Sequence, residues 1–256
     1  MKKKIKIKTK SVIILILILL IILVLSILII KLNKAKEINI TNKKEYLNIS
    51  ASNFNGLQDL IYAGKVVKDR NDYVFNGNKI IINNMDEDIL LAATLNNIIL
   101  SETSKLEEIT EENETYKVIP IDKVIEYSKK LFDKKKFTSY KNFSGCPSFK
   151  YDGSSQNYMG MFNCNTGPIV DIYVYKLERN LSTVNEYYEY ISIAYMEHSI
   201  EEGKNVYDFY KDYQKSKKIG TNETGESIIN EKNYKKLTRF KLTSKNKKIY
   251  SIEKIG

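Results

Sequence analysis

A single apolar run near the start of the chain constrains its fold most. Residues 12–30 read VIILILILLIILVLSILII, nineteen positions that are aliphatic except for Ser26. At about 1.5 Å of rise per residue, a helix of this length approaches the thickness of the hydrocarbon core of a bilayer. A helix also pairs its backbone polar groups internally, as lipid requires. The run therefore predicts a transmembrane helix over residues 11–31, with the lipid bilayer as a partner.

Lysines around this run predict its orientation. Six lie within the first ten residues, whereas three lysines and one acid follow the run within residues 31–37. Short flanks with more lysine stay in the cytoplasm. We expect residues 1–10 to be a basic cytoplasmic tail, residues 32–44 a polar tether, and residues 45–256 a domain outside the cell membrane. The long run, with no small-x-small site after it, favours an uncleaved anchor over a cleaved signal peptide.

The net charge of +10 does not indicate a nucleic-acid partner. Residues 1–44 contain eleven lysines and one acid, so the rest of the chain has as many basic as acidic residues. The excess charge belongs to the flanks of the apolar run, where it suits anionic lipid. Within the rest, residues 211–256 carry +8 and residues 45–210 carry −8. The basic end suits an anionic cell-wall polymer, or it is the solvated outer side of strands.

Helical patterns dominate the first half of the chain. Residues 57–67 form a helical pattern, and the short apolar run that follows at residues 79–82 suits a strand or a connection. Asn84, followed by acids, indicates the N-cap of a helix that continues to Leu100 and is apolar nearly all round, so we expect it at the centre of the fold. Pro120 opens another helix over residues 121–132.

The acidic stretch at residues 101–116 lies between these two helices. Its glutamates lack the Asp-x-Asp-x-Asp-Gly spacing of a calcium loop. We interpret the stretch as a solvated helix end or loop, with no metal bound.

Short alternating runs of Tyr, Phe, Ile and Val follow Phe137 and predict strands. The runs are 158–163, 169–178, 186–197, 206–213, 234–242 and 248–254. The last two form a hairpin, in whose second arm Tyr250 and Ile252 share a face. Alternation with polar residues indicates an antiparallel sheet with one wet face. The predicted fold class is α+β: an N-terminal transmembrane helix, a helical first half, and an antiparallel, tyrosine-rich β-sheet in the second half.

Two cysteines and one histidine limit the chemistry. Cys146 and Cys164 both lie beside turns, and an outer location favours a disulfide between them. Two separate buried thiols, or one reactive thiol, are the alternatives. His198, beside Glu197, is the one histidine of the chain. A single histidine excludes a Ser-His-Asp triad elsewhere and the HExxH metal motif, and we expect neither a metal site nor a cofactor.

Tyrosines crowd the two neighbouring predicted strands at residues 186–197 and 206–213. Tyrosine combines apolar area with a polar tip, so it is frequent both in half-buried sheets and at interfaces. Ordinary sheet packing is one interpretation, and a binding surface is the other. The candidate binding face consists of Tyr188, Tyr190, Tyr207 and Tyr210.

The chain ends with Tyr234–Leu242 (YKKLTRFKL) and Ile249–Ile255 (IYSIEKI). With these residues it resembles uncharacterised single-span extracytoplasmic proteins of low-GC Gram-positive bacteria, a resemblance that covers most of the chain and implies no activity. We expect a non-catalytic binding module whose partner is a cell-surface protein or a cell-wall polymer. The alternative is a cell-envelope hydrolase that uses Asp and Glu carboxylates.

Overall fold

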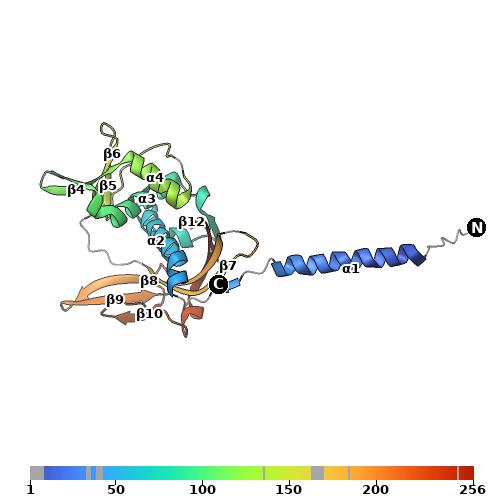
Figure 1. Cartoon of the computed structure of the whole chain (residues 1–256). Helices are drawn as coiled ribbons and strands as arrows, with labels where there is room; N and C mark the ends of the chain where they lie inside the picture. Colours follow the sequence, from blue (N-terminus) through green and yellow to red (C-terminus); the bar gives the residue numbers. More distant parts are fainter. Residues whose placement is uncertain are drawn as a thin grey trace, which may run out of the picture.

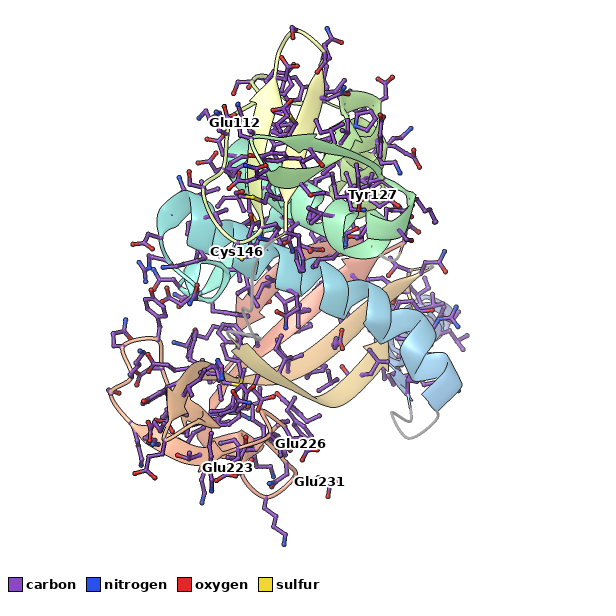
Figure 2. The ribbon with its side chains drawn as sticks, turned by 90° about the vertical axis from the view of Figure 1, so that its left-hand side faces the viewer. Glu112, Tyr127, Cys146, Glu223, Glu226 and Glu231 are labelled. Atoms are coloured by element: carbon purple, nitrogen blue, oxygen red, sulfur yellow. The ribbon has the colours of Figure 1, made fainter. Side chains whose placement is uncertain are left out.

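The protein has an α+β fold, with helices first and antiparallel strands afterwards, as the sequence predicts. The computed structural model describes residues 9–32, 36–38, 43–134, 136–162, 170–183, 185–246 and 248–256. Figure 1 shows helix α1 apart from a body that contains the other helices and the strands. In Figure 2, α2 lies across the strands of the larger sheet, and the smaller sheet and α4 lie above it.

Four α-helices occur in the described part of the chain. They are α1 (Thr9–Leu32), α2 (Lys43–Lys68), α3 (Glu87–Glu102) and α4 (Ile121–Phe132). Single 3-10 turns occur at Tyr73–Phe75, Ile82–Asn84, Thr103–Lys105 and Tyr234–Lys236. Helix α4 has the predicted bounds. Pro120 precedes it, and Asp133, with a φ of 60°, ends it in the left-handed conformation.

The predicted transmembrane helix over residues 11–31 is wrong. Within the described residues, no helix is both long enough and apolar enough to cross a membrane. Ser26, the polar residue of the apolar run, donates a hydrogen bond to the carbonyl of Ile22 (2.7 Å).

Helix α3 lies at the centre of the fold, as its apolar pattern predicts. Residues 89–96, 98 and 99 are all buried. Its N-cap, however, is Asp86 and not the predicted Asn84. The Asp86 carboxylate accepts a hydrogen bond from the backbone N–H of Asp88 (3.0 Å), whereas Asn84 belongs to the preceding 3-10 turn.

The larger sheet has eight antiparallel strands among the described residues. In the order β1-β7-β8-β11-β12-β2 they are β1 (Lys36–Ile38), β7 (Val170–Arg179), β8 (Glu186–Glu201), β11 (Thr238–Lys245), β12 (Lys248–Lys254) and β2 (Lys79–Ile81), and β9 (Lys204–Tyr210) and β10 (Lys218–Asn222) extend it. The first half of β8 pairs with β7 and β11, and its second half pairs with β9. Strand β12 has the predicted bounds, and β1 lies within the segment predicted as a tether.

A smaller antiparallel sheet contains most of the acidic stretch at residues 101–116. In the order β3-β4-β6-β5 its strands are β3 (Glu107–Glu111), β4 (Glu114–Pro120), β6 (Asn157–Met161) and β5 (Ser148–Asp152). The stretch is therefore largely a β-hairpin, not a helix end or loop. Glu112 and Asn113 have positive φ values of 52° and 70° and form its turn. Exposed glutamates along the edge strand β3 protect that edge from pairing with another chain.

The inner face of the larger sheet carries the main hydrophobic core, together with α2 and α3. Ile191 of β8 pairs with Phe240 of β11, and both side chains are buried. A second, smaller cluster consists of Ala194, Met196, Phe209, Ile229 and Leu237. It lies on the opposite, outer face. The outer face beside the first half of β8 remains outside both clusters, and it is there that the predicted tyrosines Tyr188 and Tyr190 lie.

A β-bulge changes the predicted faces of β12. Thr243 pairs with Ser251 and Ser244 pairs with Ile249, so Tyr250 is an extra residue in the ladder. Tyr250 and Ile252 therefore do not share an environment as predicted. Ile252 is buried, whereas Tyr250 is 38% exposed.

Candidate ligand-binding face

Tyr188 and Tyr190 lie together on the outer face of the larger sheet. Both belong to the half of β8 that lies between β7 and β11. Tyr188 pairs with Glu178 of β7, and Tyr190 pairs with Lys176 of β7 and Lys241 of β11. Since paired residues project from the same face of a sheet, Tyr190 has a charged neighbour on both sides, and Tyr188 has one on the β7 side.

Two further tyrosines extend this surface. Tyr175 is the extra residue of a bulge in β7. Its ring stacks on Tyr234 with centroids 4.4 Å apart and lies 6.2 Å from the ring of Tyr190. The hydroxyl of Ser192 donates a hydrogen bond to the carbonyl of Tyr234 (2.9 Å), which holds Tyr234 against the sheet. The resulting surface is named the tyrosine–lysine face, and it consists of Tyr175, Lys176, Tyr188, Tyr190, Tyr234 and Lys241.

Lysine ammonium groups lie over two of these rings. The Nζ of Lys241 is 3.9 Å from the ring centroid of Tyr188, and the Nζ of Lys176 is 5.2 Å from that of Tyr190. Both distances are within the range of cation–π attraction. Lys176 also forms an ion pair with Glu178 (2.6 Å). Lys241 forms no ion pair with any described carboxylate, so its main contact is the ring.

Carboxylates hold the tyrosine hydroxyls in place. Tyr188 donates a hydrogen bond to Glu186 (2.8 Å), and Tyr190 donates one to Glu178 (2.7 Å). Burial, and then the hydrogen bond to Glu186, raise the pKa of Tyr188 to about 12. Burial and the bond to Glu178 likewise raise the pKa of Tyr190. Both phenols therefore remain protonated donors at neutral pH.

The two carboxylates stay charged. Burial raises the pKa of Glu178, but hydrogen bonds from Lys176 and Tyr190 outweigh burial and bring the pKa below its usual value. In the same way, hydrogen bonds from its neighbours, Tyr188 first among them, lower the pKa of Glu186 against the effect of burial. Charged acceptors and protonated donors fix the ring orientations.

The other two predicted tyrosines lie elsewhere. Tyr207 of β9 is beside the smaller cluster on the outer face, where its ring stacks on His198 with centroids 4.7 Å apart. Tyr210 pairs with Tyr195 and packs against the main core on the inner side. Of the four predicted tyrosines, the structure brings Tyr188 and Tyr190 together and places the other two apart from them.

Sequence reasoning missed four members of the face: Tyr175, Lys176, Tyr234 and Lys241. For Tyr175 a signal was present, because Ile172 and Val174 alternate with tyrosines along the run that becomes β7. For Tyr234 and Lys241 no local signal exists. The position of Lys241 depends on the register of β11 against β8, and that of Tyr234 on the 3-10 turn before β11 and its hydrogen bond from Ser192 of β8.

The predicted disulfide joins Cys146 to Cys164, and Cys164 lies outside the described residues, so the pair stays a prediction. Cys146 is itself disulfide-bonded, so it is not the reactive thiol that was one alternative. Its loop packs on α2, since Tyr62 donates a hydrogen bond to the carbonyl of Pro147 (2.5 Å).

His198 does not assemble an acid–base or metal site with its acidic neighbours. Its Nε2 lies 2.9 Å from Oδ1 of Asn205, and the adjacent Glu197 pairs with Lys215 (2.6 Å). No group of histidine, cysteine and acidic side chains suited to a metal ion occurs within the described ranges. Figure 2 shows acids at both ends of the body: Glu112 above, and Glu223, Glu226 and Glu231 below.

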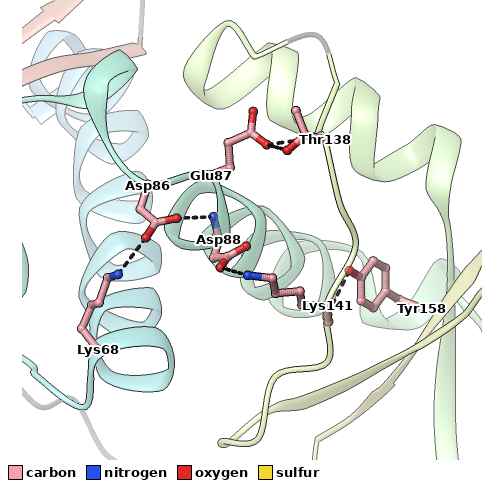
Figure 3. Close-up of polar contacts among 7 residues, drawn as sticks. All are labelled: Lys68, Asp86, Glu87, Asp88, Thr138, Lys141 and Tyr158. Atoms are coloured by element: carbon pink, nitrogen blue, oxygen red, sulfur yellow. Dashed lines mark hydrogen bonds and ion pairs between the residues drawn. The ribbon is translucent and has the colours of Figure 1, made fainter.

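The acids at the beginning of α3 all have basic or hydroxyl partners, as Figure 3 shows. The contacts are those of Asp86 with Lys68 (2.7 Å), of Glu87 with the backbone N–H of Thr138 (2.9 Å), and of Asp88 with Lys141 (2.5 Å). We name this group of six residues the α3 junction. Hydrogen bonds from Lys134 and Thr138 lower the pKa of Glu87 to about 2. The junction fastens α2 and the segment after α4 to α3.

One carboxylate lies in the interior. Asp59 of α2 is 2% exposed and accepts hydrogen bonds from the side-chain amides of Asn96 and Asn97 of α3, both at 2.7 Å. Burial raises its pKa to about 7 against the opposing effect of these bonds. Both oxygens are engaged in joining two helices, so Asp59 also has a structural role.

Comparison with known proteins does not extend this description. No protein-family model, curated protein or solved structure matches the chain. What the protein binds is therefore inferred from the chemistry of its own surface.

Proposed function

We propose that the protein is a non-catalytic binding module whose tyrosine–lysine face binds an anionic polysaccharide, such as a cell-wall polymer. The position of Lys241 carries this proposal. Its ammonium lies 3.9 Å from the ring centroid of Tyr188, and it forms no ion pair with a described carboxylate. A cation beside an aromatic ring offers an acidic sugar two contacts, one with its charge and one with the apolar side of its ring.

The rigidity of the face supports binding. Hydrogen bonds to Glu178 and Glu186 orient the rings of Tyr190 and Tyr188 before any ligand arrives. Because few side chains then need to be ordered, little binding free energy is lost. Lys241 also belongs to residues 211–256, which carry a net charge of +8. The long-range field therefore favours an anionic ligand.

A carboxylate hydrolase, the alternative function, has less support on this face. Glycoside cleavage uses one protonated and one charged carboxyl group. Hydrogen bonds keep the pKa values of Glu178 and Glu186 below their usual value, so neither is suited to be a general acid at neutral pH. Asp59 has a raised pKa, but both of its oxygens are engaged between α2 and α3.

We further propose lipid as a partner of α1. From Ile16 to Ile27 its aliphatic side chains are about half exposed, with Leu19 at 58%. Removing apolar surface from water is favourable by about 25 cal/mol per Å². The lysines before the helix suit anionic head groups. This contact does not require α1 to cross the bilayer, and the position of residues 45–256 outside the cell stays a prediction.

The polysaccharide proposal is tested with the full-length chain in detergent micelles. The probes are polygalacturonate and its methyl-esterified form, which has the same sugar ring without the charge. The variants are Lys241→Gln and, as a matched control, Lys150→Gln, which removes an exposed lysine from the smaller sheet. Affinities are measured by biolayer interferometry at low and high salt.

We expect polygalacturonate to bind and the esterified polymer to bind much more weakly. Lys241→Gln should weaken binding about fivefold, the equivalent of roughly 1 kcal/mol, and Lys150→Gln should leave it unchanged. High salt should weaken the charge-dependent part. Equal binding of both polymers, or equal effects of the two substitutions, would contradict the proposal.

A further inference from the structure

A pocket of about 300 Å³ opens at the tip of the β11–β12 hairpin, beside the end of α4. Its volume is at the lower end of the range for small-molecule sites. Its wall includes apolar, aromatic, cationic and acidic side chains: Phe132, Asp133, Lys245, Lys248, Ile249 and Tyr250. Such a mixture suits a ligand that has both a ring and a charge.

The bulge in β12 builds one side of this pocket. Regular alternation would place Tyr250 on the same face as the buried Ile252. Because the bulge inserts Tyr250 as an extra residue, its side chain instead lines the pocket and is 38% exposed. Bulges are frequent next to functional sites, where they redirect a side chain.

The two lysines of the pocket differ in how they are engaged. The Nζ of Lys248 donates hydrogen bonds to the carbonyl of Lys129 (2.8 Å) and to the carboxylate of Asp133 (3.0 Å), at the negative end of α4. The Nζ of Lys245 lies 4.2 Å from the ring centroid of Tyr250 and 3.7 Å from the carboxylate of Glu186. The second distance is longer than a hydrogen bond. Lys245 is therefore the less tightly engaged of the two cations, and the one better placed to meet an anionic ligand.

The pocket is linked to the tyrosine–lysine face through Glu186. This carboxylate accepts hydrogen bonds from Tyr188 (2.8 Å) and from Thr183 (3.1 Å). Its capacity is thus largely taken by neutral donors, which leaves only the long contact with Lys245. The chain of contacts from Lys241 over Tyr188 to Glu186 and Lys245 leads from the face to the pocket.

We infer that this pocket holds a single sugar ring that carries an anionic group, with the ring against Tyr250 and the anion at Lys245. The inference rests on the proposed function, because the unit in the pocket would be one unit of the polymer that lies on the face. A carboxylate and a phosphate offer Lys245 the same chemistry, and the experiment distinguishes them.

The test is isothermal titration calorimetry of the full-length chain with galacturonic acid, glucose 6-phosphate and galactose. Both acidic sugars, or one of them, should bind, and galactose should bind more weakly. Lys245→Gln should weaken the binding of the acidic sugar about fivefold. Tyr250→Leu should also weaken it, because the ring is lost. Lys150→Gln, an exposed position in the smaller sheet and outside both the pocket and the face, should leave it unchanged. Circular dichroism melting shows whether each variant is folded, and Lys245→Gln is informative even if the bulge does not tolerate leucine.

The outcomes separate this inference from the proposed function. If polygalacturonate binds through Lys241 but no acidic monosaccharide depends on Lys245, the pocket inference is wrong and the proposed function stands. If the monosaccharide depends on Lys245 but the polymer does not depend on Lys241, the pocket is a site and the face is not. If neither acidic sugar binds more tightly than galactose, the inference is also overturned.

Discussion

The contacts that fasten α3 and the tyrosine–lysine face use the same kinds of side chain for different purposes. Around α3, each acid of the junction has a partner on another element, and Asp59 joins α2 to α3 in the interior. On the face, the acids hold the hydroxyls of tyrosines in the same sheet, and Lys241 lies over a ring and forms no ion pair with a described carboxylate. The difference suggests that losses around α3 lower stability, whereas losses on the face lower binding.

The largest effect is expected at Asp59, whose pKa is raised from 3.8 to about 7. Between these values the folded protein retains a proton that the unfolded chain releases, so this contribution to the free energy of unfolding falls as the pH rises from about 4 to 7. By linkage the loss is on the order of 4 kcal/mol. Asp59→Asn removes this pH-dependent contribution to the free energy of unfolding. Urea unfolding should therefore show the variant gaining stability relative to the native chain between pH 4 and pH 8. If the difference in free energy of unfolding between the two proteins is the same at every pH from 4 to 8, the pKa of Asp59 is not raised in the folded protein.

A smaller loss is expected at the α3 junction. Glu87→Gln removes the charge that Lys134 and Thr138 hydrogen-bond, and the N-terminal end of α3 loses a favourable acid. We expect the free energy of unfolding to fall by about 1–2 kcal/mol. Glu231→Gln, at an exposed position, is the control and should change it by less than about 0.5 kcal/mol. Similar values for the two substitutions would show that the junction does not stabilise α3.

The face should respond less in stability. Tyr188→Phe removes the hydrogen bond to Glu186 but keeps the ring under Lys241. The cost in the free energy of unfolding should be about 0.5–1 kcal/mol. Affinity for polygalacturonate should change less than for Lys241→Gln, because the ring and the cation remain. A complete loss of binding would show that the hydroxyl, and not the ring, contacts the polymer.

Local sequence signals predicted parts of this fold well. Pro120 and the apolar spacing after it gave the bounds of α4, and the alternation at residues 248–254 gave β12. The hairpin of β3 and β4 was missed because its glutamates interrupt the apolar alternation of a strand, and because its place in a sheet depends on the pairing of β4 with the distant strand β6. The predicted N-cap of α3 was two residues early. Asn84 and Asp86 are both good capping residues, but Asn84 belongs to the preceding 3-10 turn, so Asp86 caps the helix.

The candidate site was predicted in part for a related reason. Strand alternation places Tyr188 and Tyr190 on one face, and both were named. Tyr207 and Tyr210 are three positions apart in β9, so they project from opposite sides of it. The lysine that carries the proposal was missed because only the register between β8 and β11 sets Lys241 opposite Tyr190.

The most direct test of the central claim compares two pairs of lysines that carry the same charge. Lys176→Gln with Lys241→Gln removes both cations of the tyrosine–lysine face, and Lys136→Gln with Lys150→Gln removes two exposed lysines elsewhere. The measurement is the Kd of the full-length chain for polygalacturonate. We expect the first pair to raise the Kd about tenfold or more, and the second pair to raise it by no more than about twofold. An equal rise in both would mean that the polymer responds to net charge alone, and the face would not be its binding site.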